Sequence, residues 1–425
     1  NKQLTEDLTT TGNKLVNVLV DHFSFSSSGG AGIVARLLVE GQVALGVGAQ
    51  LHTITDSSLW GSPASHLSLT IRAGIDQYIV SSNPGAPMFS LFRRSAPSIK
   101  QKPRPGAVIH LHWTEGVLRR QKVVEWLSAG HNVVFTLHDM SPLTGGCHQS
   151  MGCQAYESSC KSCPQAKPMF RFSVESRFDK LPELTGFSSQ IVVVAPSSWM
   201  REKALRSRYF SKLPIEVIEN PIDPVFFKEF DRQKERRVLG ISENAFVACS
   251  VAAQVSNPAK RIKDCMKAFY SACQKTGVEG IFILVGDGSK ELVKMHPNAI
   301  SLGVSGPDLV AKALAASDVL LSGSLAESAG MTIREAGAQG MASIVIANGG
   351  SDKMMESPES GYLVTNFEEM ELMVIEMLNS GLRKTSGEQA LKLRGLSQAK
   401  AGLETVSQLY KDVYASFDST MEAPG

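Results

Sequence analysis

The chain has 425 residues, of which 43% are apolar and 20% charged, and its 43 basic and 41 acidic residues leave a net charge of +2. This composition excludes a mostly disordered chain, and the near balance of charge argues against nucleic acid as a partner. The longest apolar runs are far shorter than the roughly 18 residues of a membrane span. The first residues are polar and carry both charge signs, so we expect no signal peptide and a cytoplasmic protein.

Short apolar runs alternate with amphipathic stretches in the first half of the chain. Strands are predicted at residues 15–20, 50–54, 107–111, 132–137 and 190–194, and helices at residues 32–45 and 118–129. This alternation predicts an α/β fold with a parallel sheet covered by helices. Residues 81–106 are rich in proline, serine and basic side chains and are expected to form a long loop.

The alternation restarts after a turn-rich break at residues 220–224. Further strands are predicted at residues 215–218, 245–251, 281–285, 299–302, 319–322 and 343–346, and helices at 262–274, 308–316 and 403–417. We therefore predict two doubly wound, Rossmann-like lobes that face a central cleft. The predicted units are residues 1–213, a linker at 214–227, residues 228–398, and a C-terminal helix and tail at 399–425 that pack back across the lobes.

Two short motifs lie at predicted strand ends. Gly29, Gly30 and Gly32 follow the first strand and open a helix, where free backbone N–H groups favour an anion. A tight strand-to-helix turn without a ligand explains these glycines equally well. His138 and Asp139 end another strand, where a neutral imidazole can bond a sugar hydroxyl and the carboxylate can orient the imidazole or a nearby acceptor. A purely structural histidine is the alternative.

Two glutamates stand eight residues apart in the second half of the chain. Glu327 lies in a loop rich in glycine and serine, and Glu335 lies within the helix that follows it. They cannot form a close pair on one helical face, so they suit two different hydroxyl sets of one elongated ligand. The start of the helix between them offers free N–H groups to a phosphate.

With this element the chain resembles the retaining GT-B glycosyltransferases of family 4 (group 1), whose donor-site signature is Glu-x7-Glu. The other matching segments are Gly29-Gly30-Ala31-Gly32, His138-Asp139, Ala195-Pro196-Ser197-Ser198-Trp199, Asn220-Pro221-Ile222-Asp223 with Phe226, residues 284–288 (Leu-Val-Gly-Asp-Gly) and Leu302-Gly303. The resemblance covers about residues 15–415, and the order of the segments makes it specific.

The resemblance implies a GT-B fold whose first lobe faces the acceptor and whose second lobe binds the nucleotide-sugar donor. Glu335 is similar to the glutamate that binds the ribose hydroxyls, and Glu327 to the one that contacts the donor sugar. Lys260 resembles the lysine that neutralises the diphosphate, and His138 the histidine beside the donor sugar. Backbone groups expected near the diphosphate, sugar or acceptor are those of Gly30, Gly330, Met331 and Thr332.

Two positions near Lys260 depart from the family pattern. Val255 stands where an arginine is frequent, and Arg261 replaces the usual glycine. Arg261 or Lys263 is therefore expected to share the phosphate role.

The activity implied is retaining transfer of a hexose from a UDP- or GDP-hexose to a glycan or lipid-linked acceptor, in cell-surface polysaccharide synthesis. No Asp-x-Asp metal motif is present, so we expect catalysis without a metal or other cofactor. Two alternatives stay open: a nucleotide-sugar 2-epimerase on the same fold, and a non-catalytic nucleotide-binding member.

Four cysteines follow the His-Asp segment within 17 residues: Cys147, Cys153, Cys160 and Cys163. A structural zinc site is one expectation for such a cluster, and redox-labile disulfides or unlinked thiols are the others. A subset of the family carries a similar cysteine-rich loop, which we expect to shape the acceptor side of the cleft.

Three basic groups lie in the first half of the chain. They are Arg93, Arg94, Lys100, Lys102 and Arg104; Arg119, Arg120 and Lys122; and Arg201, Lys203, Arg206, Arg208 and Lys212. Each such charge can contribute about 1 kcal/mol near anionic lipid. They suggest peripheral contact with the inner face of a membrane, although ordinary solvated faces explain them as well.

Overall fold

A computed structural model provides the structure of the chain. It describes residues 18–54, 71, 74, 78–79, 89–91, 99, 101–348, 350–355, 360–380 and 387–419. Arg93, Arg94, Lys100 and most of the predicted loop at 81–106 lie outside these residues.

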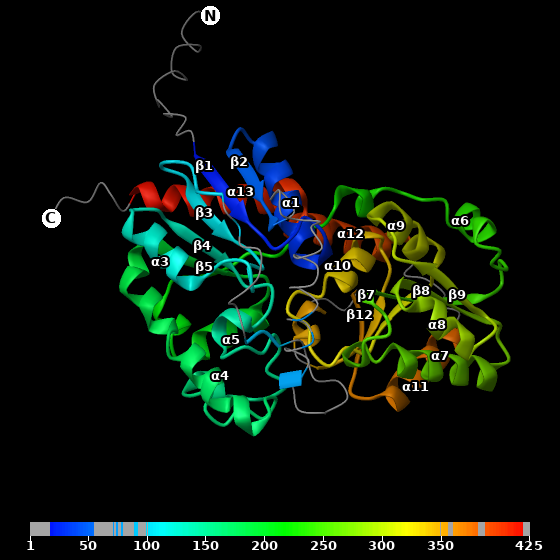
Figure 1. The fold of residues 1–425 in the computed structure, drawn as a ribbon. Helices are drawn as coiled ribbons and strands as arrows, with labels where there is room; N and C mark the ends of the chain where they lie inside the picture. Colours follow the sequence, from blue (N-terminus) through cyan, green and yellow to red (C-terminus); the bar gives the residue numbers. More distant parts are fainter. Residues whose placement is uncertain are drawn as a thin grey trace, which may run out of the picture.

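The first lobe is built on a parallel six-stranded sheet of order β2-β1-β3-β4-β5-β6 (Figure 1). Its strands are β1 (Leu19–Phe23), β2 (Gly48–His52), β3 (Val108–Leu111), β4 (Val133–Thr136), β5 (Ile191–Ala195) and β6 (Ile215–Val217). Its helices are α1 (Gly29–Ala44), α3 (Arg120–Ser128), α4 (Arg171–Phe178) and α5 (Ser198–Arg206). Neighbouring residues of the central strands belong to different cores, as the period of two requires. Both faces of this sheet are therefore buried.

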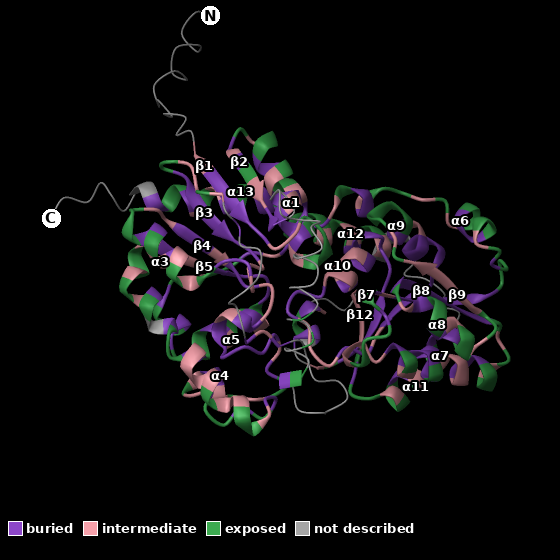
Figure 2. Cartoon of the chain, viewed as in Figure 1, coloured by how far each residue is buried: buried purple, intermediate pink, exposed green. Residues whose placement is uncertain are grey.

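The second lobe repeats this architecture with the strand order β12-β11-β10-β7-β8-β9. Its strands are β7 (Phe246–Gln254), β8 (Gly280–Asp287), β9 (Ala299–Gly303), β10 (Val319–Ser322), β11 (Ser343–Ile346) and β12 (Gly361–Val364). Its helices are α6 (Arg232–Val238), α7 (Ile262–Thr276), α8 (Ser289–Leu292), α9 (Pro307–Ala316), α10 (Met331–Ala338) and α11 (Phe367–Asn379). Purple strands in both lobes of Figure 2 mark these two buried sheets.

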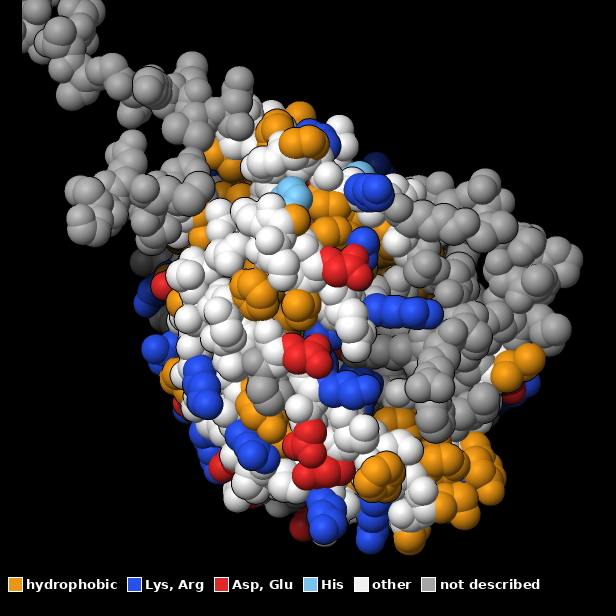
Figure 3. Space-filling model, turned by 60° about the vertical axis from the view of Figure 1, so that its left-hand side comes forward, with side chains coloured by type: hydrophobic (Ala, Val, Ile, Leu, Met, Phe, Trp, Pro, Cys, Tyr) orange, Lys and Arg blue, Asp and Glu red, His pale blue; other side chains and the backbone are white. Residues whose placement is uncertain are grey.

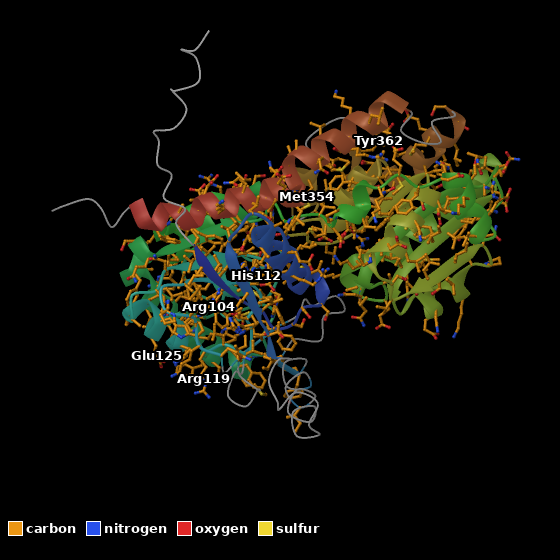
Figure 4. The ribbon with its side chains drawn as sticks, turned by 90° about the horizontal axis from the view of Figure 1, so that it is seen from above. Arg104, His112, Arg119, Glu125, Met354 and Tyr362 are labelled. Atoms are coloured by element: carbon orange, nitrogen blue, oxygen red, sulfur yellow. The ribbon has the colours of Figure 1, made fainter. Side chains whose placement is uncertain are left out.

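Two helices at the end of the chain connect the lobes. Helix α12 (Gly387–Ala401) contacts α10, and α13 (Leu403–Ser419) then runs back along the first lobe against α1 (Figure 4). Tyr410 and Tyr414 of α13 are buried in the core on that face of the first sheet. The first lobe is thus completed by the last described helix of the chain.

The predicted fold class, two parallel α/β sheets in two lobes, is confirmed. The first strand lies at 19–23 rather than 15–20, and residues 15–17 are outside the described range. Strand β12 was not anticipated, because its sequence, Gly-Tyr-Leu-Val, is too short to show a clear period. No described helix has both the length and the apolarity that a bilayer crossing requires.

Candidate functional site

The loop and helix that follow β10 form the centre of the candidate site. Helix α10 begins after Gly330, whose φ of +54° is left-handed. A Cβ at Gly330 would collide with the Met354 sulfur, so only glycine fits both the conformation and the space. The first turn of a helix has N–H groups without intrahelical acceptors, and here those of Met331 and Thr332 open α10. The sequence prediction of a helix start at this point is confirmed.

Lys260 and Glu327 meet beside this loop. Lys260 Nζ donates to Glu327 Oε1 at 2.5 Å, and the side chains are 32% and 17% exposed. Lys260 ends a short 3-10 turn after β7, and Ala259 O accepts from Leu325 N in the loop that carries Glu327. The structure therefore brings together two of the predicted site residues.

Glu335 lies one to two turns into α10 and is half-buried. No hydrogen bond or ion pair to its carboxyl group is formed by the described residues. Burial, with a further contribution from the negative charge of Asp223, raises the pKa of Glu335 to about 8. Because no described residue occupies its oxygens, this carboxyl group can accept hydrogen bonds from the hydroxyl groups of a ligand.

The two lobes touch at the same loop. Gln149 Nε2 of the first lobe donates to Ser328 Oγ at 3.0 Å, and Ser197 Oγ donates to the carbonyl oxygen of Ser328 at 2.7 Å. Ser197 also caps α5 by accepting from Met200 N. The residues around Glu327 are therefore positioned by both lobes.

His138 follows β4 and lines a cavity at the carboxyl ends of β3 and β4. Trp113, Glu115 and Ser141 also line this cavity. His138 Nε2 lies 3.0 Å from His112 Nδ1. Burial lowers the pKa of His138 to about 4, so its imidazole is neutral at pH 7.

Asp139 forms no described hydrogen bond with His138, so the first of the two roles expected for this carboxylate is not seen. It accepts from Trp113 Nε1 at 2.8 Å and from Ser141 N at 2.8 Å, and its Oδ2 lies 2.6 Å from His148 Nδ1. No described hydrogen bond joins the Asp139 carboxylate to the His138 ring, because these three partners occupy it. Burial opposes ionisation of Asp139, yet His148 and the Ser141 hydrogen bonds keep its pKa below the usual value. Asp139 thus anchors the cysteine-rich loop.

The other predicted site residues form no described hydrogen bond or ion pair with Lys260, Glu327 or Glu335. Arg261, at a left-handed φ of +52°, places its guanidinium over Phe367 at 4.2 Å and its Nε 3.5 Å from Asp264. Lys263 is exposed on α7, and Gly30 is exposed at the start of α1. The left-handed backbone explains why glycine is usual at position 261.

The four clustered cysteines border one small cavity. Cys147, Cys160 and Cys163 are buried and Cys153 is half-buried, and all four are free thiols. Among the described residues, three His, Cys, Asp or Glu ligand atoms come within 4.8 Å of one another only at His22, His110 and His112. The four thiols line the same cavity, but no three of their sulfur atoms lie within 4.8 Å of one another.

Sequence reasoning missed that histidine cluster. His110 lies in β3 beside His22 of β1, and His112 follows directly after β3 with its ring stacked on that of His110. The spacing His-x-His at the end of a predicted buried strand was the available signal. Three buried imidazole rings need hydrogen-bond partners, because a buried polar group without a partner lowers the stability of the folded protein.

The chain has two Rossmann-like lobes, each built on a parallel sheet, and they meet at the loop that carries Glu327. This architecture is that of the GT-B class of fold. Residues 231–392, within the second lobe, match the family model described as Glycosyl transferases group 1.

Individual proteins support this assignment. N-acetyl-alpha-D-glucosaminyl L-malate synthase of Bacillus anthracis is 34% identical over 158 residues, which cover 35% of this chain and 40% of that protein. The match thus spans less than half of the relative's length. Sucrose-phosphate synthase from Thermosynechococcus elongatus superposes with a TM-score of 0.64 at 16% identity, over 95% of this chain and 100% of the other. Anabaena HepE in complex with UDP and glucose gives 0.57 at 16% identity, over 94% and 100% of the chains. At these identities the two structures show a common fold.

Proposed function

We propose that this chain is a glycosyltransferase that moves a hexosyl group from a nucleoside diphosphate sugar to an acceptor, with retention at the anomeric carbon and without a metal. The observation that carries the proposal is the arrangement around α10. An ion-paired glutamate and an unpaired one lie on either side of a helix start with free N–H groups.

Each group has a task in this reaction. Glu335 would accept from the ribose hydroxyls, and the N–H groups of Met331 and Thr332 would bind the diphosphate. Lys260 would neutralise the charge that develops on the leaving diphosphate and so stabilise the transition state. Glu327, released from Lys260, would accept from donor-sugar hydroxyls. The described residues around this loop offer no evident nucleophile, which favours transfer on the same face with the leaving phosphate as base.

A relative and a structural neighbour support a nucleotide-sugar ligand. The name of the Bacillus anthracis relative describes a sugar-transfer product, and the Anabaena neighbour was solved with UDP and glucose. We infer a UDP- or GDP-hexose donor and a glycan or lipid-linked acceptor in cell-surface polysaccharide synthesis.

The test is calorimetric titration with UDP and GDP, followed by nucleotide release from a panel of their sugars. We expect one diphosphate to bind and one sugar to be consumed. Glu335→Gln should weaken binding without changing the melting temperature by more than a few degrees. Failure of every nucleotide to bind would overturn the proposal.

We also infer contact with an anionic membrane surface at the inner face. Met169 and Phe172 near the start of α4 are 69% and 84% exposed, and Lys167 and Arg171 flank them. Exposed apolar side chains can insert between lipid headgroups while neighbouring basic side chains attract the anionic lipids. The face drawn in Figure 3 mixes basic with acidic side chains, so the proposed contact is local.

Sedimentation with vesicles tests this contact. The protein should sediment with phosphatidylglycerol vesicles and not with phosphatidylcholine vesicles, and Phe172→Ser should reduce the bound fraction. Equal binding to both lipids, or none, would contradict it.

A further inference from the structure

A buried line of hydrogen bonds leads from α1 to His138. His22 Nε2 lies 2.8 Å from Gln42 Oε1, His22 Nδ1 lies 2.9 Å from His112 Nε2, and His112 Nδ1 lies 3.0 Å from His138 Nε2. Gln42 and His22 are 0% exposed and His112 is 5% exposed. Figure 4 shows His112 within the first lobe, beneath the path of α13.

A second branch leaves the same glutamine. Gln42 Nε2 donates to the hydroxyl of Tyr414 at 3.0 Å, and that hydroxyl lies 2.7 Å from His110 Nδ1. His110 Nε2 in turn lies 2.8 Å from Thr136 Oγ1. In this structure the Gln42 amide thus turns its oxygen toward His22 and its nitrogen toward Tyr414.

In this orientation the amide sets the direction of every bond in the first branch. Its oxygen can only accept, so His22 carries its proton on Nε2 and, being neutral, accepts at Nδ1. His112 must then donate from Nε2 and accept at Nδ1. His138 therefore donates from Nε2, and its Nδ1 keeps a bare lone pair. Burial lowers the pKa of all three histidines, which keeps the rings neutral.

A metal ion does not explain the cluster, although His22, His110 and His112 bring ligand atoms within 4.8 Å of one another. Both ring nitrogens of each of these residues already have a hydrogen-bond partner. The rings of His110 and His112 are stacked, with centroids 4.2 Å apart, so their in-plane lone pairs do not converge. Binding an ion would break bonds that have no replacement in the dry interior.

We propose that Gln42 and His22 are positioning residues that fix His138 as the Nε2–H tautomer, so that its Nδ1 accepts a hydrogen bond from a hydroxyl of the bound sugar. This inference rests on the proposed glycosyltransferase function. No described residue forms a hydrogen bond with His138 Nδ1, and His138 lines the cavity described above. An unprotonated ring nitrogen accepts a hydrogen bond from a hydroxyl group, whereas its lone pair repels the negative charge of a carboxylate. The site should therefore prefer a neutral sugar over the matching uronic acid at this contact.

The experiment is a long-range proton–nitrogen NMR correlation on ligand-free protein labelled at histidine nitrogens. His138 is assigned by the signal lost in His138→Gln, and His131, which bonds to Ala107 O, serves as an internal control. We expect protonated Nε2 and bare Nδ1 at His138 in the natural sequence. His22→Gln should preserve this state, since an amide can accept from His112 and donate to Gln42. His22→Leu removes the acceptor and should allow protonated Nδ1 at His138.

The inference is overturned if His138 carries its proton on Nδ1 in the natural sequence, or if His22→Leu folds and leaves the tautomer unchanged. A stoichiometric metal lost in His22→Gln would also overturn it. If His22→Leu does not fold, Gln42→Leu provides the same test. These spectra are recorded without a nucleotide sugar. A failure of the proposed function would instead appear as an absence of nucleotide-sugar turnover, which is a separate measurement. Where turnover exists, His22→Gln should retain it within about threefold, and His22→Leu should lower kcat 10- to 100-fold with unchanged nucleotide Kd.

Discussion

The ammonium group of Lys260 lies 2.5 Å from a carboxylate oxygen of Glu327, so the cation proposed for the diphosphate is paired with the anion proposed for the sugar. The pair neutralises itself in the ligand-free protein. A nucleotide sugar would offer phosphate oxygens to Lys260 and hydroxyl groups to Glu327. One ligand could thus replace the ion pair with two new sets of bonds, and a nucleotide alone would leave Glu327 without a partner.

Lys260→Met should lower nucleotide-sugar turnover by about 10²–10³-fold, as loss of one donor to developing charge typically does. The measurement is the rate of nucleotide release at saturating donor. Lys267→Met, on the exposed face of α7, is the matched control and should keep the rate of the natural sequence. A Lys260→Met enzyme with an unchanged rate would remove the lysine from the mechanism.

Nucleotide binding should release a proton at pH 7. Burial, with the charge of Asp223 in second place, raises the pKa of Glu335 to about 8, so the free carboxyl group is largely protonated. Ribose hydroxyls that donate to this group favour its ionised form and lower its pKa in the complex. The affinity for UDP or GDP should rise with pH up to about 8, by at most tenfold per unit, and then level off.

Calorimetry in two buffers of different ionisation enthalpy measures this proton. Glu335→Gln should bind more weakly and release no proton from this position, which separates Glu335 from the phosphate groups of the ligand. Proton uptake by the natural sequence would contradict the assignment of Glu335 to the ribose.

Gly330→Ala should destabilise the second lobe by about 1–3 kcal/mol, because alanine is strained at a left-handed φ and its Cβ meets Met354. Chemical denaturation measures the change. Adding Met354→Ala should remove the steric part of the loss and leave the backbone part. Gly395→Ala in α12, where a Cβ would meet open space, is the control and should be neutral or stabilising. Equal effects of the two alanines would contradict this explanation.

Our proposal for the cysteine-rich loop is one structural Zn²⁺ bound by Cys147, Cys153, Cys160 and Cys163. The four thiols border one cavity, but binding would have to draw their sulfurs together. Protein prepared under reducing conditions should contain about one zinc per chain, and Cys163→Ser should lose it, as should treatment with a chelator. Because zinc binds the thiolate, affinity should fall as pH falls. A zinc content near zero, with four titratable thiols, would leave these residues as packed cysteines.

Periodicity predicted the two-lobe fold because buried parallel strands and amphipathic helices have distinct patterns. The succession of strand, glycine- and serine-rich loop and helix also predicted a helix start between Glu327 and Glu335. The sequence did not predict what Asp139 contacts, because its partners Trp113 and His148 come from other segments of the chain. The Lys260–Glu327 pair joins residues 67 positions apart. The network from Gln42 to His138 joins α1 and β1 to the segments that follow β3 and β4. Contacts of this kind depend on packing between elements, which a local pattern does not encode.

Helix α13 has a consequence for how the protein is made. Its Tyr414 bonds to His110, 304 positions earlier, and its buried face closes the core of the first sheet. A ribosome that has finished the first six strands has therefore not yet made the helix that covers them. We expect the nascent first lobe to expose apolar surface throughout synthesis of the second and to depend on chaperones during that interval. Supplying α13 as a separate peptide should then stabilise an isolated first lobe.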